Sequence, residues 1–195
     1  MDVERSVSSR DTPHRFVASY LYELPFGKGR YLLRQLPNAL ESVIGGWQFN
    51  GITTIQSGTA LGIAALNTAG TFGQTEYANN NGKSGALSGR AQDRLNRWFD
   101  TSVFSQPDPY TYGNVSPRIA DIRGHYINNF DLSLFKEFHP GGEWMKLQFR
   151  AEALNAFNRV QFANPNTTVT SSSFGRVTAQ SNTPRQVQFG LKLMW

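Results

Sequence analysis

Apolar and polar residues alternate along much of this chain. Between residues 129 and 138, phenylalanine and leucine dominate the even positions and polar residues the odd ones, with Lys136 as an exception. Because successive side chains of a strand point to opposite faces of a sheet, this period of two predicts a strand with one apolar and one polar face. The same alternation returns in three other stretches, and a tyrosine-rich run near the N-terminus resembles it less cleanly. The pattern predicts five strands, near residues 14–25, 46–57, 126–138, 143–155 and 186–195.

The predicted strands are joined by connections of two kinds. Residues 139–142 form a tight turn by composition, whereas 58–125 and 156–185 are long and rich in Gly, Asn, Ser, Thr and Pro. Short turns at one end and long loops at the other are typical of outer-membrane barrels, in which the short turns face the periplasm. The connection 26–45 is long for such a turn, and residues 36–43 within it predict a short helix.

The composition favours strands over helices as the membrane-spanning elements. The chain has 14 Phe, 7 Tyr and 4 Trp among 195 residues, yet its mean hydropathy is -0.42. No stretch approaches the ~20 consecutive apolar residues of a transmembrane helix, whereas a transmembrane strand needs only ~10 residues with every second one apolar. We therefore expect an all-β fold of antiparallel strands.

One segment resembles a known family. The sequence FRAEALNAFNR at 149–159, followed by Phe162, resembles the penultimate strand and loop start of TonB-dependent receptors, where the phrase N-L-F-N-x-x-Y is typical. Ala156 replaces the usual Leu of that phrase. Further segments resemble the Oar-like branch, whose members often carry a carboxypeptidase-regulatory-like N-terminal domain. These segments are LPFGKG at 24–29, GGWQFNG at 45–51, QSGT at 56–59 and NFDLSLFK at 129–136.

The resemblance implies the fold and function of a transporter. Such receptors are 22-stranded barrels with an N-terminal plug, energised through TonB to move solutes across the outer membrane of Gram-negative bacteria. On this interpretation, residues 1–195 are the C-terminal segment of the barrel, about five strands with long outer loops, and the plug and N-terminal strands are absent. The N-terminus also lacks the features of a signal peptide, so we expect an incomplete chain. The expected partners are outer-membrane lipid, the barrel-assembly machinery, the remainder of the barrel, and TonB only through the missing plug.

The last predicted strand carries a candidate assembly signal. In outer-membrane barrels, a C-terminal strand of alternating apolar residues that ends on an aromatic residue resembles the signal read by the barrel-assembly machinery. The residues that fit this signal are Phe189, Leu191, Leu193 and Trp195. The alternative is the last strand of a soluble sheet, because alternation does not say whether the apolar face meets lipid or a core.

The polar faces would line the lumen of a barrel. If Phe138 pairs with Glu143 across the turn, Asp131 falls opposite Arg150, which predicts a lumenal ion pair between them. We expect this pair to hold the strand register rather than to contact a substrate.

Aromatic residues near strand ends would sit at the membrane interfaces. Lys136 falls on the apolar face close to a strand end, where we expect its long stem to reach the headgroups. The competing interpretation of the aromatics is ordinary hydrophobic packing. The expected interfacial residues are Trp47, Phe138, Trp144 and Trp195.

The sequence offers no catalytic or cofactor motif. Cysteine is absent, and the spacing of His14, His125 and His139 builds no metal site. The segment 81–84 resembles the end of a phosphate loop, but Tyr77 stands where the first glycine is needed. The 19 Lys and Arg are scattered without a basic run, which argues against nucleic-acid binding. We expect neither an enzyme nor a cofactor.

Two other classes remain as alternatives to a transport component. A soluble or surface-exposed all-β binding module would bury its apolar face and dissolve without detergent. A small independent barrel such as a porin needs about eight strands, more than the five predicted here. Five strands of a barrel would instead expose two unpaired edges and a bare apolar face.

Overall fold

The computed structural model describes residues 5–70, 76–140 and 142–195. The chain divides into two compact units, which we name by their content. The sheet unit comprises residues 16–55, 128–160 and 183–195, and the loop unit comprises residues 1–15, 56–127 and 161–182. Each unit is described below by itself.

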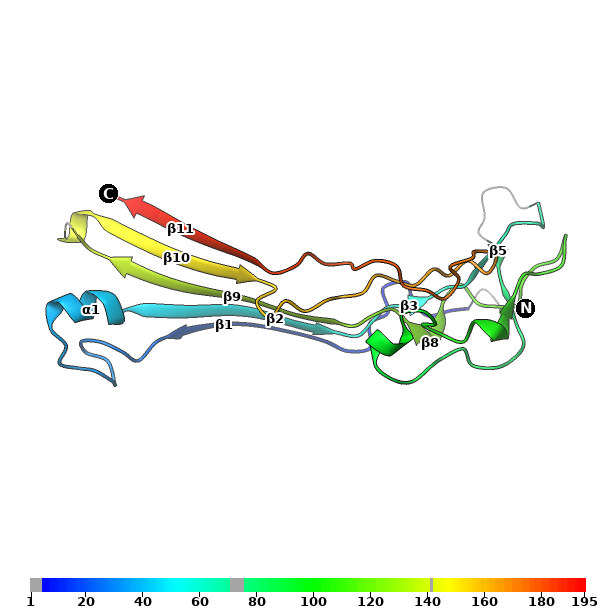
Figure 1. The fold of residues 1–195 in the computed structure, drawn as a ribbon, viewed down its shortest axis with the longest axis horizontal. Helices are drawn as coiled ribbons and strands as arrows, with labels where there is room; N and C mark the ends of the chain where they lie inside the picture. The colour runs from blue at the N-terminus through cyan, green and yellow to red at the C-terminus, as the bar shows by residue number, and fades with distance from the viewer. Residues whose placement is uncertain (1–4, 71–75, 141) are drawn as a thin grey trace. The chain divides into compact units, whose positions relative to one another are not determined.

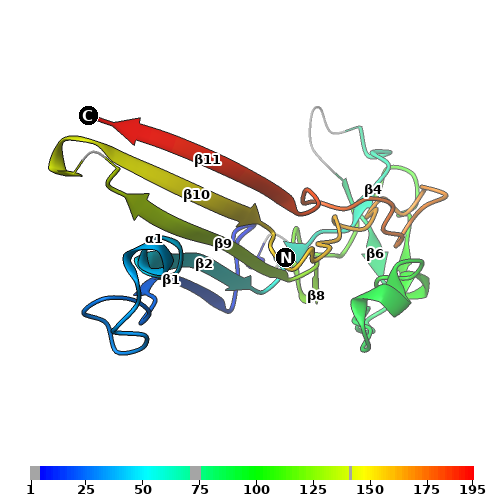
Figure 2. The same cartoon turned by 60° about the vertical axis from the view of Figure 1, so that its left-hand side comes forward.

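The sheet unit is built on five strands. They are β1 (Arg15–Glu23), β2 (Trp47–Gln56), β9 (Ile127–Phe138), β10 (Lys146–Leu154) and β11 (Gln186–Met194). They form one sheet in the order β1-β2-β9-β10-β11, and neighbouring strands point in opposite directions (Figure 1). Both the five predicted strands and the all-β antiparallel fold are confirmed. The sheet does not close on itself, because β1 and β11 are its two outer strands (Figure 2).

The register between β9 and β10 differs from the one expected. Phe138 lies opposite Leu147, four residues beyond Glu143, and Arg150 consequently lies opposite Phe135 rather than Asp131. The cause is the turn, in which a short 3-10 helix, η3 (Gly142–Trp144), occupies residues that the prediction had placed in the strand. Because the shift is an even number of residues, each side chain keeps the face that its parity predicted.

The connection between β1 and β2 contains the predicted helix. It is α1 (Asn38–Ile44), and its end is tied to the next strand because Trp47 Nε1 donates to the carbonyl oxygen of Val43 at 2.9 Å. Gly27 in the same connection has a φ of +114° and no room for a Cβ, which would meet the Glu41 carboxylate. Glycine is required there because an L side chain rarely adopts that backbone conformation.

The loop unit has a hydrophobic core of its own. Three two-stranded sheets frame it: β3 (Ala60–Leu61) with β8 (Ile119–Arg123), β4 (Ala64–Ala65) with β5 (Glu76–Tyr77), and β6 (Asn79–Asn80) with β7 (Phe104–Ser105). Two 3-10 helices, η1 (Ala91–Arg94) and η2 (Thr101–Val103), complete it. The buried core residues are Leu61, Ile63, Ala78, Trp98, Phe99, Val103, Phe104, Val115 and Ile122.

Both long connections contribute to this core. Phe174, from the connection between β10 and β11, packs edge-on against Phe99 with ring centroids 5.3 Å apart. The main-chain N–H of Trp98 donates to the carbonyl oxygen of Gly175 at 2.8 Å. The two segments that sequence reasoning treated as separate loops therefore fold together.

Candidate functional site

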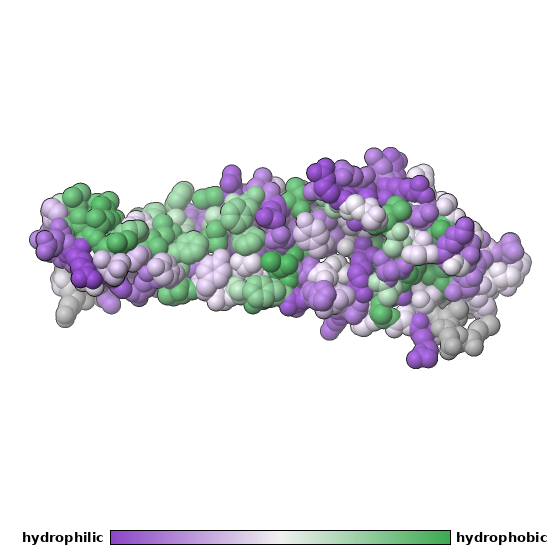
Figure 3. Space-filling view, turned by 90° about the horizontal axis from the view of Figure 1, so that it is seen from below, coloured by the Kyte–Doolittle hydropathy of each residue, from purple (hydrophilic) through white to green (hydrophobic). Residues whose placement is uncertain are grey.

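The two faces of the sheet differ in character along β10 and β11. On one face, the cross-strand pairs are apolar: Leu147 with Leu193, Phe149 with Leu191, Ala151 with Phe189, and Ala153 with Val187. On the other face, Gln148 lies opposite Lys192 and Glu152 opposite Gln188. Apolar side chains gather along the sheet unit on the side drawn in Figure 3. We call the second face the polar face and treat it as the candidate functional site.

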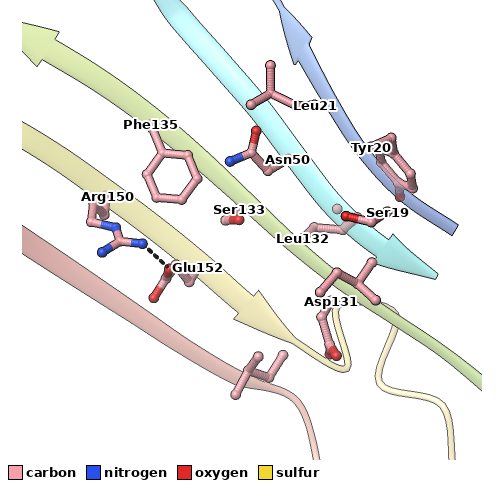
Figure 4. Close-up of a pocket in the computed structure, with 13 residues that line it drawn as sticks. Ser19, Tyr20, Leu21, Asn50, Asp131, Leu132, Ser133, Phe135, Arg150 and Glu152 are labelled. Atoms are coloured by element: carbon pink, nitrogen blue, oxygen red, sulfur yellow. Dashed lines mark hydrogen bonds and ion pairs between the residues drawn. The ribbon is translucent and has the colours of Figure 1, made fainter. Parts of the chain in front are cut away.

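The polar face holds a shallow cavity of about 540 Å³ that extends over β1, β2, β9 and β10. Asn50, Ser133, Arg150 and Glu152 line it from three neighbouring strands, and Asp131 lies at one end (Figure 4). The face is not purely polar, because Leu21 of β1, Ile52 of β2 and Phe135 of β9 also line the cavity. The cavity therefore offers charged and amide groups on a partly apolar floor.

The Arg150 guanidinium is held by groups on its own face. Its Nη2 donates to Glu152 Oε1 at 3.2 Å, and the guanidinium lies 4.7 Å from the centre of the Phe135 ring. Its Nε is buried without a hydrogen-bond partner. The predicted ion pair between Asp131 and Arg150 is therefore wrong, because the register places these residues four positions apart along the strands.

Asp131 instead fixes the end of β10. Its Oδ1 accepts a hydrogen bond from the main-chain N–H of Asn155 at 2.9 Å, and its Oδ2 accepts one from Asn129 Nδ2 at 2.9 Å. A carboxylate that accepts from a main-chain N–H gains from a charge-assisted hydrogen bond, which here joins β9 to the residue after β10. The Asp131 carboxylate thus holds the chain at the point where it leaves β10.

Asn155 is the central residue of this junction, and sequence reasoning missed its role. It is 6% exposed and adopts a φ of +49°. Its Nδ2 donates to the carbonyl oxygens of Arg159 at 3.0 Å and Thr183 at 3.1 Å, while its Oδ1 accepts from the N–H of Arg159 at 2.8 Å. One side chain therefore ties the start of the β10–β11 connection to its end.

Asn158 repeats the arrangement on a smaller scale. It has a φ of +50°, and its Oδ1 accepts from the N–H of Arg185 at 3.0 Å. Between the two asparagines, Phe157 packs edge-on against Phe130 with ring centroids 5.0 Å apart. Asparagine tolerates the left-handed region better than most residues. The phrase NAFN at 155–158, noted in the sequence only as a family resemblance, was the available signal for this junction.

Further polar contacts cross the strands of the polar face. Gln148 Nε2 donates to Glu137 Oε1 at 3.1 Å, and Gln188 Nε2 donates to Glu152 Oε2. Cross-strand polar pairs of this kind contribute roughly 0.2–1 kcal/mol each and favour one register. The carboxylates of Glu137 and Glu152 are therefore engaged with side chains of neighbouring strands.

The residues of the candidate assembly signal lie together on the apolar face of β11. Phe189 and Leu191 are 73% and 68% exposed, and Trp195 at the end of the strand is 90% exposed. Leu193 shares their face and lies opposite Leu147. The structure thus places these four residues on one exposed edge, and their reading by the assembly machinery stays a prediction.

The four aromatic residues expected at a membrane interface lie at one end of the sheet. Trp47 begins β2, Phe138 ends β9, Trp144 ends η3, and Trp195 follows β11. This is the end with the β1–β2 and β9–β10 connections, so their common level fits an interfacial girdle. Lys136 departs from expectation, because it is 3% exposed and donates to the carbonyl oxygen of Gly45 instead of reaching outward.

The described residues contain neither a helix suited to span a membrane nor a cluster of metal ligands. None of the helices in residues 5–70, 76–140 and 142–195 is long and apolar enough to cross a membrane. The same residues contain no group of three or more His, Cys, Asp or Glu side chains close enough to share a metal ion.

An antiparallel sheet with one apolar face, one hydrogen-bonded polar face and long loops at one end defines the class of β-barrel membrane proteins. A family model for the outer membrane beta barrel domain matches residues 1–188. The chain belongs to this outer membrane beta barrel family. Neither a curated protein nor a solved structure matches it. The family implies a location in the outer membrane of a Gram-negative bacterium, with the apolar face towards lipid and the polar face towards the interior.

Proposed function

We propose that this chain forms one sector of a larger transport barrel of the TonB-dependent receptor type, of the Oar-like branch. The polar face would line the path of a solute, and the loop unit would lie outside the cell. The chain would serve transport rather than catalysis. It would act with the remainder of the barrel, and with TonB through a plug that is not among the described residues.

The unpaired edges of the sheet are the observation that carries this proposal. Strands β1 and β11 are the outer strands of the five-stranded sheet, and a bacterial outer-membrane barrel needs about eight strands to close. An open edge in a membrane leaves main-chain N–H and C=O groups without partners, which costs several kcal/mol per group. Further strands must therefore cover both edges in the membrane.

The local sequence supports the Oar-like assignment at specific structural positions. The segment GGWQFNG at 45–51 joins α1 to β2, and NFDLSLFK at 129–136 lies within β9. The phrase at 155–158 forms the hydrogen-bonded junction after β10. The two Oar-like segments GGWQFNG and NFDLSLFK thus lie at the start of a strand or within one, and the phrase at 155–158, which resembles TonB-dependent receptors in general, directly follows the end of one.

Cysteine labelling in outer membranes tests the orientation of the barrel wall. The chain contains no cysteine, so each introduced thiol reports on one position. We would place Ser133→Cys on the polar face, Leu191→Cys on the apolar face, and Tyr110→Cys in the loop unit as a control that is 86% exposed. A charged, water-soluble thiol reagent should label Ser133→Cys and Tyr110→Cys in membranes, but should label Leu191→Cys only after denaturation.

Co-purification tests the transport assignment. An affinity tag inserted after Gly82, where an added Cβ would meet no other atom within 4 Å, would recover the intact assembly from the outer membrane in detergent. The proposal expects further barrel strands and a plug in the recovered assembly, and binding of that assembly to the periplasmic domain of TonB. Recovery of the chain alone from the aqueous fraction would overturn the proposal and favour the soluble all-β binding module.

The assembly signal is tested separately. We propose that the machinery reads the apolar face of β11 and its final aromatic residue. Truncation of Trp195, or Phe189→Asp on the same face, should lower the amount of protein in the outer membrane. The matched control is Gln186→Asp on the polar face of the same strand, opposite Leu154, which should assemble nearly as well as the parent chain.

A further inference from the structure

The loop unit contains a second cavity, separate from the polar face of the sheet. Its volume is about 800 Å³. Residues 57–58, 89–92 and 124–126 line it together with Arg94 and Trp98, and all of these belong to the loop unit. The cavity therefore forms within one compact unit, from segments that are far apart in the sequence.

The wall of this cavity is held by a chain of hydrogen bonds. Trp98 is 3% exposed, and its Nε1 donates to the carbonyl oxygen of Arg123 at 2.7 Å. The Arg123 guanidinium pairs with Asp11 at 2.6 Å and donates to the carbonyl oxygen of Gly58 at 3.2 Å. A Cβ at Gly58 would collide with the main chain of Gly124. These contacts fix Trp98 and Gly58 in the wall of the cavity and Arg123 beside it.

Arg94 is a cation in the wall that has no carboxylate partner among the described residues. Its Nη1 donates to the carbonyl oxygens of Leu87 at 2.7 Å and Trp98 at 3.2 Å, and its guanidinium lies 5.0 Å from the centre of the Trp98 ring. No described residue accepts from its Nη2, and its Nε is buried without a partner. By contrast, the neighbouring Arg90 and Arg97 are paired with Asp93 and Asp100. Arg94 is thus positioned by main-chain oxygens with donors left over.

A flat aromatic surface lies in the same cavity. The His125 and Tyr126 rings stack at 4.5 Å with 23° between their planes, and the edge of Phe162 supports His125 at 5.0 Å. Burial lowers the pKa of His125, a main-chain hydrogen bond at Tyr126 opposes this, and the charge of Arg94 adds to the lowering. Tyr126 is 50% exposed and can receive a planar group on its ring.

We propose that this cavity binds a small anionic ligand that carries a flat ring. The anionic oxygens, from a carboxylate or a phosphate, would accept hydrogen bonds from Arg94, and the ring would lie against Tyr126. A guanidinium fixed in place loses little entropy on binding and suits the two oxygens of such an anion. The idea that this ligand is a transported solute rests on the proposed function. The binding of an anionic ring compound in the cavity does not depend on it.

Equilibrium binding to the purified, detergent-solubilised protein tests the site. The probes are benzoate and phenyl phosphate, with benzamide as the neutral analogue of benzoate, and binding is followed by calorimetry. We expect benzamide to bind at least roughly tenfold more weakly than the better of the two acids, because the charge-assisted hydrogen bonds are lost. Whichever acid binds better identifies the class of anion.

Two variants and two controls separate recognition from folding. Arg94→Gln should weaken binding of the acids at least roughly tenfold, with Arg176→Gln, an exposed arginine of the same unit, as its control. Since Arg94 also holds two carbonyl oxygens, Tyr126→Leu is the second variant, with Tyr110→Leu as its control. The Tyr126→Leu replacement removes only a half-exposed ring and should weaken binding of all ring-bearing probes several-fold.

The outcomes also distinguish this site from the transport proposal. Equal binding of benzoate and benzamide, unchanged binding in both variants, or no binding of either acid at millimolar concentration would overturn the site. Acid binding that depends on Arg94, in a protein that recruits neither a plug nor TonB, would keep the site and overturn the transport proposal. Recruitment of TonB by a protein that binds neither acid would keep the transport proposal and overturn the binding site.

Discussion

The main-chain N–H of Asn155 donates to Asp131 Oδ1 at 2.9 Å. This hydrogen bond joins the end of β10 to the start of the neighbouring strand β9, where the chain leaves the sheet for a connection of some thirty residues. The Asn155 side chain then spans to Arg159 and Thr183, at the two ends of that connection. A long connection is therefore closed at its base by one buried amide.

Replacement of Asn155 should separate its two contributions. Asn155→Gly keeps the φ of +49° accessible but loses the side-chain hydrogen bonds, which should lower the free energy of unfolding by about 1–3 kcal/mol. Asn155→Ala loses the same bonds and adds the strain of a left-handed alanine, a further ~1 kcal/mol. Urea unfolding of the folded protein in detergent would rank the variants, and equal stability of the two would show that the backbone strain does not matter.

The corrected register between β9 and β10 can be tested by disulfide formation. Ser133 lies directly opposite Glu152, so cysteines at these two positions should oxidise to a disulfide, since Cα atoms of opposed residues fall within the ~4.4–6.8 Å that a disulfide needs. Cysteines at Asp131 and Arg150, the pair that the shorter turn would oppose, should stay reduced. Because the chain has no cysteine of its own, a mobility shift before and after reduction reports the pair directly. A disulfide between positions 131 and 150, with none between 133 and 152, would show that the register predicted from the sequence is the correct one.

Tyr20 covers Gly51 across the first two strands. The Tyr20 ring occupies the space that a Cβ at Gly51 would need, and it stacks on Phe49 with centroids 6.0 Å apart. Gly51→Ala should therefore displace the ring and cost about 1–3 kcal/mol of stability. In a background of Tyr20→Ala the same glycine replacement should cost much less, because the obstructing ring is gone.

A double-mutant cycle in urea measures this coupling between Tyr20 and Gly51. The matched control is Tyr20→Phe, which keeps the ring and removes only the 3.3 Å hydrogen bond between the Tyr20 hydroxyl and Thr53 Oγ1. It should retain the sensitivity to Gly51→Ala. Strictly additive effects of Tyr20→Ala and Gly51→Ala would contradict the contact.

The strands and their faces could be predicted because alternation is a local property of the sequence. Leu191 and Lys192 belong to opposite faces whatever the neighbouring strand does. The register could not be predicted, because it depends on how many residues the turn consumes. Here η3 (Gly142–Trp144) takes up residues that a tight turn would have left in the strand, and composition alone does not distinguish the two turns.

The loop core was hidden for a different reason. Ile63, Phe99 and Phe174 are separated by long polar stretches and follow neither a period of two nor a helical period. None of the three lies in a named strand, and strands near them such as β3 and β7 are only two residues long, so pattern analysis has nothing to detect. The cavity beside this core could not be predicted either, since Arg94 and Tyr126 line one cavity only after the loop unit has folded. The sequence predicted that Asp131 and Arg150 lie on the polar face, but it did not predict which residues they contact.

The Asp100 carboxylate makes the loop unit sensitive to acid. Hydrogen bonds from the Ser102 hydroxyl, Arg97 and the Ser102 main chain lower the pKa of Asp100 from 3.8 to about 2. Because the folded-state pKa is depressed, Asp100 contributes stability that is fully present above pH 3.8 and is lost as the pH falls towards about 2. Asp100 caps the N-terminus of η2, whose Val103 enters the core, so this loss should loosen the core of the unit.

Asp100→Asn should lower the stability of the loop unit at neutral pH and flatten its dependence on pH between 3.8 and about 2. Asp108→Asn serves as the control, since the Asp108 carboxylate accepts no hydrogen bond from the described residues, and it should leave the acid dependence intact. Urea unfolding at a series of pH values, followed by the fluorescence of buried Trp98 with the other three tryptophans replaced by phenylalanine, measures both. A parent chain whose stability is constant over this pH range would show that Asp100 is no better stabilised in the folded protein than in the unfolded chain.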